Sequence, residues 1–181
     1  YSREGAAISI TTGRGDDGDT DLWFGDRAGK SSPSVEALGA FDEARAALGM
    51  GRSLAPEWMK PEILRIQKDL FTASSEVATL RGKADRLKER IGPDRVRWAE
   101  SQIARYEKVI QINDWAIPGE SPPGAALDLA TTILRRAERR LVGLEESGLI
   151  DNRELLVFVN RLSDLVFLMA RAADREVEVG E

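Results

Sequence analysis

The stretch TTGRGDDGDT, residues 11–20, combines three glycines, three aspartates and one arginine. Three uses suit such a composition: a metal-binding loop, a phosphate-binding loop or a solvated surface turn. The glycines would let the backbone approach an anion closely and point successive N–H groups at it. Thr12 and Thr20 would add hydroxyl donors. Arg14 and Lys30 would add positive charge. Taken alone, the stretch favours the solvated turn slightly, with the phosphate-binding loop as the alternative.

A calcium site is the use that the residues disfavour most clearly. Asp17, Asp19 and Asp21 match the first, third and fifth positions of an EF-hand loop. Leu22 then stands where the sharp turn needs glycine, and Ala28 stands where a bidentate glutamate is needed. The stretch also lacks the Gly-Lys-Ser/Thr ending of a Walker A loop.

A second charged constellation lies in the sequence TTILRRAERRLVGLEE. At helical spacing Arg135, Glu138 and Arg139 share one side, because residues three and four apart are neighbours on a helix. Arg136 and Arg140 form a second row. A solvated, ion-paired helix face is the ordinary explanation of this pattern.

Polar residues also interrupt the apolar pattern at VNRLSD. Asn160 and Asp164 share a helix face, with Ser163 and Phe167 close by. An asparagine beside a leucine stripe is more often a satisfied amide than a ligand contact. Neither constellation therefore identifies a ligand by itself.

The composition limits the chemistry that these side chains can perform. With 42% hydrophobic and 31% charged residues, the chain is expected to form a single globular domain, residues 1–181. It has no cysteine and no histidine, which excludes disulfides, thiolate or imidazole metal ligands and every Ser-His-Asp mechanism. A net charge of −5 argues against a general nucleic-acid partner.

The hydropathy pattern indicates where the protein works. The longest apolar runs, such as LLVFV, are far too short to span a bilayer, so no membrane association is expected. The first ten residues lack a signal-peptide pattern. We therefore expect a cytoplasmic protein.

Apolar periodicity predicts the elements that would hold these groups. Helical spacing occurs in five stretches, residues 35–48, 57–80, 94–110, 127–144 and 151–177. Asp94 is the candidate N-cap of the third stretch, and Gly49 and Gly51 would weaken the end of the first. Strand-like alternation is weak and confined to AISITT, residues 7–12. We predict an all-α five-helix bundle with an irregular N-terminal arm.

Several motifs occur together in an order that is more specific than any one of them. TGRGDDGDT matches the phosphate-loop pattern T-x-x-G-D-x-G-x-T at Thr12, Gly15, Asp16, Gly18 and Thr20. Then follow Lys30, the pattern E-A-x-G-x-x-D-E at Glu36, Ala37, Gly39, Asp42 and Glu43, and the stretches IPGESPPGAALDLA, RRAER and NRLSD. From about Thr11 to Ala173, the chain resembles the PduO-type ATP:cob(I)alamin adenosyltransferases, which are helical-bundle corrinoid adenosyltransferases. With these motifs in order, the phosphate-binding interpretation of the loop becomes the favoured one.

The resemblance implies a ferritin-like bundle whose arm, residues 1–32, binds phosphate. It also implies a chemistry that suits a chain without histidine. Cob(I)alamin is itself the nucleophile and attacks the 5′ carbon of ATP, which Mg²⁺ accompanies; adenosylcobalamin forms and triphosphate leaves. The protein positions the reactants and stabilises the triphosphate charge. Further implied partners are two more copies of the chain in a homotrimer, a cobalamin reductase and an adenosylcobalamin-dependent enzyme.

The resemblance assigns roles to individual residues. Arg135 and Lys30 are expected to be catalytic, and no side chain is expected as a fixed metal ligand. The expected ATP site comprises Thr12, Gly15, Asp16, Gly18, Thr20, Lys30, Arg135, Glu138 and Asn160, the last two on the nucleoside side. Trp115 would push away the lower cobalt ligand, which makes cobalt(II) easier to reduce, and Phe167 would line the same apolar pocket. Asp42 and Thr131 are expected at the interface between subunits.

The chain departs from the family pattern at four positions. Asp19 replaces a threonine, Glu120 a glycine, Asp128 a histidine and Thr131 an arginine. Two of these changes bring carboxylates near the expected polyphosphate, which is electrostatically unfavourable. The alternative function is therefore a divergent relative that binds ATP or corrinoid with weak or no transfer, as a carrier or regulator. A structural bundle without a ligand is the third hypothesis.

The replacement at position 131 leaves Asp42 without the arginine that pairs with it in the family. A buried carboxylate without a partner would be costly. Arg45, three residues along the same helix, and Arg135, one turn from Thr131, are the two candidates to compensate. We favour Arg45, because its pairing is local and leaves Arg135 available for phosphate.

Overall fold

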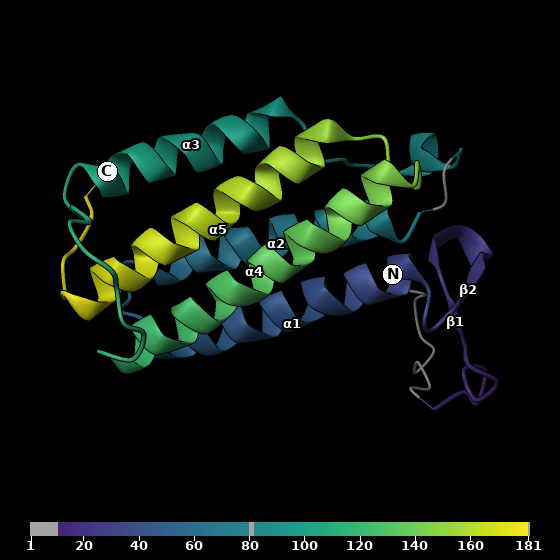
Figure 1. Cartoon of the computed structure of the whole chain (residues 1–181), viewed down its shortest axis with the longest axis horizontal. Helices are drawn as coiled ribbons and strands as arrows, with labels where there is room; N and C mark the ends of the chain where they lie inside the picture. The colour runs from purple at the N-terminus through teal and green to yellow at the C-terminus, as the bar shows by residue number, and fades with distance from the viewer. Residues whose placement is uncertain (1–10, 80–81, 181) are drawn as a thin grey trace, which may run out of the picture.

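The computed structural model describes residues 11–79 and 82–180, in which the helices form one bundle. In chain order the elements are β1 (Asp19–Asp21), η1 (Trp23–Gly25), β2 (Arg27–Gly29), α1 (Pro33–Leu54), α2 (Lys60–Val77), η2 (Ala84–Arg86), α3 (Pro93–Glu107), α4 (Pro122–Glu146) and α5 (Arg153–Asp174). Figure 1 shows the long helices side by side, with β1 and β2 beyond one end of the bundle. The predicted bundle is confirmed, and the arm contains a small antiparallel sheet that periodicity did not predict.

The starts of the helices follow local chemistry, and two predicted starts were wrong. α2 begins at Lys60 rather than Glu57, because a turn closed by Met59 N–H and the Pro56 carbonyl precedes it. α3 begins at Pro93, behind an N-cap at Gly92. Asp94 is therefore not the cap. It lies in the first turn, where the negative charge of a carboxylate interacts favourably with the positive end of the helix dipole.

The C-terminal part of α1 corrects a further expectation. The helix runs through Gly49 and Gly51 to Leu54 instead of ending before them. A Cβ added to Gly51 would lie 2.9 Å from Cδ2 of Leu127 on α4. Gly51 thus allows α1 and α4 to approach closely, and this packing offsets the low helix propensity of glycine. In the AISITT stretch, residues 7–10 lie outside the described part of the chain, and Thr11 and Thr12 have no regular structure.

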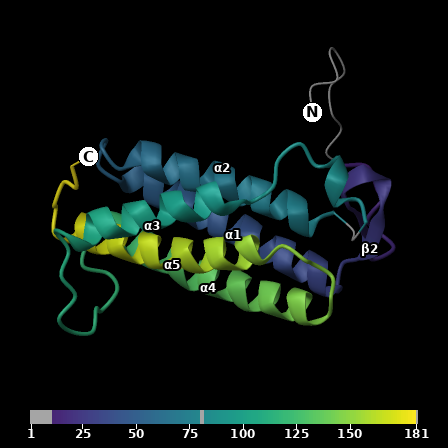
Figure 2. The ribbon, with the colours of Figure 1, turned by 90° about the horizontal axis from the view of Figure 1, so that it is seen from above.

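α4 lies between α1 and α5 in the bundle. It packs against α1 on one side and α5 on the other, while α2 packs against α1 and α3 against α5 (Figure 2). The inward positions of these helices are fully buried, among them Phe41, Leu70, Leu127, Leu134, Leu141, Phe158 and Leu162. Full burial of each such side chain contributes about 1.5–3 kcal/mol. Within residues 11–79 and 82–180 no helix has the length and hydropathy that a bilayer span requires.

The arm is attached to the end of α2. The backbone N–H of Trp23 donates to the Ala78 carbonyl at 3.1 Å, and Lys83 pairs with Asp26 at 2.6 Å. Both contacts lie at the end of the bundle where α1 begins (Figure 1). The glycine-rich stretch therefore belongs to that end of the molecule.

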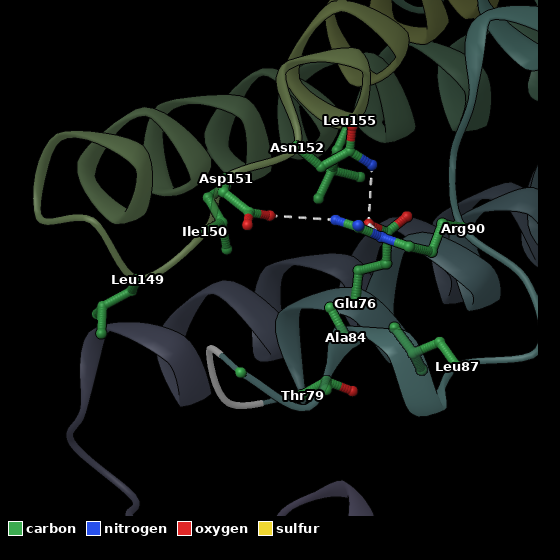
Figure 3. A pocket seen from close by; sticks show the side chains of 11 residues that line it. Glu76, Thr79, Ala84, Leu87, Arg90, Leu149, Ile150, Asp151, Asn152 and Leu155 are labelled. Atoms are coloured by element: carbon green, nitrogen blue, oxygen red, sulfur yellow. Dashed lines mark hydrogen bonds and ion pairs between the residues drawn. The ribbon is translucent and has the colours of Figure 1, made fainter.

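The start of α5 is held by a partly buried polar network around a cavity of about 30 Å³ (Figure 3). Asn152 caps the helix, and its Nδ2 donates to Glu76 Oε2 at 2.8 Å and to the Ile91 carbonyl at 2.9 Å. Arg90 bridges Glu76 and Asp151, at 3.0 Å and 3.2 Å. These contacts fix where α5 begins, and thereby the positions of the polar residues further along that helix.

Candidate functional site

The glycine-rich stretch forms two consecutive turns. The Asp16 N–H donates to the Gly13 carbonyl at 3.2 Å, and the Gly18 N–H donates to the Gly15 carbonyl at 3.3 Å. Gly13 and Gly18 have φ angles of +68° and +88°, in the region that disfavours other residues. The sequence thus builds a compact loop in which backbone groups lie close to the surface.

Lys30 belongs to this loop although it is far along the chain. Its backbone N–H donates to the Gly18 carbonyl at 2.8 Å, and its Nζ donates to the Gly15 carbonyl at 2.5 Å. A Cβ added to Gly15 would lie 3.1 Å from that Nζ, so a larger residue there would make the end of the lysine shift by a few tenths of an ångström. The β1–β2 pairing, with Thr20 opposite Ala28, brings the lysine back over the loop. The predicted association of Lys30 with the glycines is present.

Arg14 does not add free charge to the loop. Its guanidinium pairs with Asp21 at 3.1 Å, and Arg27 pairs with the same carboxylate at 3.5 Å. Arg27 also donates to the Arg14 carbonyl at 2.8 Å. These pairs are exposed to solvent and add little stability. These ion pairs tie the loop to the hairpin of β1 and β2. Among the described residues of the arm, Lys30 is the cation that has no ion pair.

The second polar site is an open pocket of about 390 Å³ between α4 and α5. Its lining residues are Arg135, Glu138, Arg139, Val142, Asn160, Ser163 and Asp164. The predicted members Arg135, Glu138 and Asn160 therefore lie together. No described residue of the arm lines this pocket, so a single chain does not bring Arg135 to Lys30.

The two predicted rows of charge on α4 face different neighbours. Arg136 pairs with Glu43, and Arg140 pairs with Glu36 at 3.4 Å, both on α1. The other row has Arg135, which has no ion-pair partner among residues 11–79 and 82–180. The ordinary explanation, an ion-paired helix face, is correct for the row of Arg136 and Arg140. Arg135, Glu138 and Arg139 of the other row border the pocket, so its lining carries both signs of charge.

Asn160 is held at both ends of its amide. Its Nδ2 donates to Glu138 Oε1 at 2.9 Å, and its Oδ1 accepts from Nη1 of Arg161 at 2.7 Å. The side chain is half-buried. A satisfied amide, expected from the pattern, is thus present at the rim of the pocket. The sequence analysis did not predict the contact with Arg161, because nothing in the sequence distinguishes Arg161 from an ordinary surface arginine.

The residues expected to contact corrinoid lie toward the other end of the bundle. Trp115, in the connection between α3 and α4, is 95% exposed, and neighbouring Ile117 is 77% exposed. Phe167 on α5 is half-buried, with the Arg171 guanidinium 5.3 Å from its ring centre. The apolar pocket expected around Trp115 and Phe167 is not closed in the single chain.

Asp128 points into the bundle, toward Arg171 on α5. It is buried and pairs with Arg171 at 2.5 Å, and Arg171 also pairs with Asp174 at 3.0 Å. The pKa of Asp128 lies above its usual value, because burial raises it more than the positive charge of Arg171 lowers it. Asp174 accepts from Ser121 Oγ at 2.7 Å, which ties the end of the Trp115 connection to α5. The apolar stripe did not show that Asp128 points inward, because its partner Arg171 lies 43 residues further along the chain.

Asp42 and Thr131 differ in burial within the single chain. Asp42 is 69% exposed and pairs with Arg45 at 3.6 Å. Thr131 is buried, and its Oγ1 donates to the Leu127 carbonyl at 2.9 Å. The Asp42–Arg45 pair is the local one that we favoured, but the carboxylate is not buried within one chain, so the expected desolvation cost does not arise there. Their role at a subunit interface stays a prediction.

Comparisons with known proteins point to a single family. The profile described as cobalamin adenosyltransferase matches residues 10–173. The chain is 34% identical to the corrinoid adenosyltransferase PduO of Salmonella typhimurium over 93% of this chain and 51% of that protein. It is 34% identical to a corrinoid adenosyltransferase of Citrobacter freundii over 94% of this chain and 97% of that protein. It thus spans about half the length of the first relative and nearly all of the second.

Solved structures show the same likeness in three dimensions. A variant PduO-type ATP:corrinoid adenosyltransferase from Lactobacillus reuteri, complexed with cobalamin and ATP, superposes with a TM-score of 0.83. The sequences are 33% identical, over 92% of this chain and 91% of that one. Another variant of this type from the same organism, complexed with ATP, has a TM-score of 0.83 and 32% identity over 92% of this chain and 94% of that one.

Proposed function

The chain belongs to the cobalamin adenosyltransferase family, and we propose that it transfers the 5′-deoxyadenosyl group of ATP to cob(I)alamin. The electron pair of cobalt(I) forms the cobalt–carbon bond. The C5′–O bond breaks, and its electron pair leaves with triphosphate. This reaction needs neither a protein nucleophile nor a strong general base, which suits a chain without cysteine and histidine.

The observation that carries the proposal is the unpaired Arg135 beside a fixed Glu138–Asn160 pair. An unpaired guanidinium stabilises negative charge that develops on a leaving triphosphate. Glu138 and Asn160 offer an acceptor and a donor to the nucleoside. Lys30 and the N–H groups of the glycine-rich loop would hold the other side of the triphosphate.

A homotrimer would unite the two halves of this site. Among the described residues of one chain, only residues of α4 and α5 line the Arg135 pocket, and the Lys30 loop lies beyond the end of the bundle. A neighbouring copy can supply the missing loop, so we place the complete site between subunits. Asp42 and Thr131 would then lie near that interface. A single species of monomer mass in light scattering at micromolar concentration would contradict this arrangement.

The corrinoid side and the metal complete the proposal. Trp115 and Phe167 would form the apolar surface against the corrinoid, with Trp115 displacing the lower cobalt ligand. Mg²⁺ would arrive with ATP, because the described residues contain no cluster of three acidic side chains that could hold it alone. Asp16 at the exposed loop could reach it through water. A reductase that delivers cobalt(I) and an enzyme that uses adenosylcobalamin are the expected partners.

An anaerobic assay with ATP and chemically reduced cobalamin tests the function. We expect the spectrum of the cobalt–carbon product to appear, together with one equivalent of triphosphate. ATP binding is measured in parallel by calorimetry. Binding without product would refute transfer and would favour the alternative of a carrier or regulatory protein.

A further inference from the structure

We propose that Arg161 is a positioning residue for the nucleoside, because it fixes which way the Asn160 amide faces. The inference rests on the proposed function. Nη1 of Arg161 donates to Asn160 Oδ1 at 2.7 Å, and Nε of Arg161 donates to Glu100 Oε1 at 3.2 Å. Glu100 lies on α3, so α3 restrains an arginine that in turn restrains the pocket between α4 and α5.

An asparagine amide needs such a restraint. Its oxygen and its NH₂ group are similar in size, but one only accepts hydrogen bonds and the other only donates them. Asn160 lies between a guanidinium, which only donates, and the Glu138 carboxylate, which only accepts. Rotation of the amide by half a turn would set donor against donor and acceptor against acceptor. Only one orientation satisfies both neighbours.

The fixed orientation determines what the pocket offers. With Oδ1 held by Arg161 and one N–H of Nδ2 held by Glu138, Asn160 keeps its second N–H for a ligand. Glu138 keeps its Oε2 as an acceptor. Arg161 itself is not among the residues that line the pocket. It therefore acts through Asn160 and not by touching the substrate.

The test uses the full chain and compares Arg161→Gln with Arg161→Lys. Loss of one charge-assisted contact on an amide that binds ATP should raise the KM for ATP by about tenfold in Arg161→Gln. The kcat and the KM for cobalamin should change less than threefold. Arg161→Lys keeps a charged donor and should recover at least half of the loss on a logarithmic scale.

A double-mutant cycle separates positioning from a general structural role. In an Asn160→Ala background, Arg161→Gln should have no further effect on the KM for ATP, because the group that it positions is gone. Arg153→Gln is the matched control, since it breaks another exposed ion pair on α5, with Glu145 at 3.4 Å. This control should leave both constants unchanged.

Two results would overturn the inference. One is a KM for ATP in Arg161→Gln within twofold of the parent. The other is an equal rise in KM in the Asn160→Ala background. ATP binding by calorimetry gives the same comparison without transfer. A parent protein that binds ATP but forms no product would refute only the proposed function, and the difference in affinity between the variants would still decide the role of Arg161.

Discussion

The pocket between α4 and α5 and the connection of residues 108–121 differ in how completely a single chain prepares them. In the pocket, Glu138 and Asn160 are already joined by a hydrogen bond and oriented by Arg161. In the connection, Trp115 is 95% exposed and contacts no core. In the proposed function, the pocket is the nucleotide half and is already ordered, whereas the free energy that orders the proposed corrinoid half would come from binding. The larger and more apolar substrate of the proposed reaction would then supply that free energy.

The largest expected effect concerns the base of that open connection. Arg171→Met would leave the buried carboxylates of Asp128 and Asp174 without their cation. We expect the free energy of unfolding to fall by about 3–5 kcal/mol, measured by urea denaturation. Arg14→Met is the control, because its ion pair is exposed, and it should cost less than about 1 kcal/mol. Equal losses in the two variants would mean that burial does not distinguish these pairs.

The next largest effect is expected in the pocket between α4 and α5. Arg135→Ala removes one of the two arginines that line the pocket, and we expect kcat/KM for ATP to fall by roughly 10- to 100-fold. Arg136→Ala is the matched control on the same helix, since Arg136 pairs with Glu43 away from the pocket. An Arg135→Ala protein with normal ATP affinity and rate would remove Arg135 from the site.

Trp115→Ala should affect only the connection of residues 108–121 and leave the pocket between α4 and α5 unchanged. Because its side chain contacts solvent in the single chain, the variant should fold normally and bind ATP with the parent affinity. Turnover with cobalamin should fall by about tenfold, since an aromatic surface of this size is lost from the corrinoid side. The spectrum of bound cobalt(II)alamin reports on the mechanism. If the four-coordinate signal is the same as in the parent, Trp115 does not displace the lower ligand.

The smallest effect is expected at the position where the family arginine is missing. Asp42 already pairs with Arg45, so Arg135 is not withdrawn from the pocket. Thr131→Arg should therefore change turnover less than tenfold. A thermal melt controls for folding, because Thr131 is buried. A gain above tenfold would show that the missing arginine limits the natural protein.

The two halves also differ in how well the sequence predicted them. The periodicity of leucine and alanine predicted the bundle, because burial on one face repeats with the helical turn. The motifs predicted that Arg135, Glu138 and Asn160 lie together, since they sit on two predicted helices. The Arg161–Glu100 contact could not be predicted, because it depends on how α3 packs against α5. The inward direction of Asp128 depends likewise on Arg171, which is 43 residues away.

In the proposed function, the position of Lys30 has a consequence for how ATP would reach the loop. Its charge is held by the Gly15 carbonyl rather than by a carboxylate, so it is positioned without being neutralised. The whole chain carries a net charge of −5, which repels a tetra-anion at long range. Attraction must therefore come from local cations within about 8 Å, the screening length at physiological ionic strength. Added salt should slow the encounter with ATP through these cations, even though the protein as a whole is acidic.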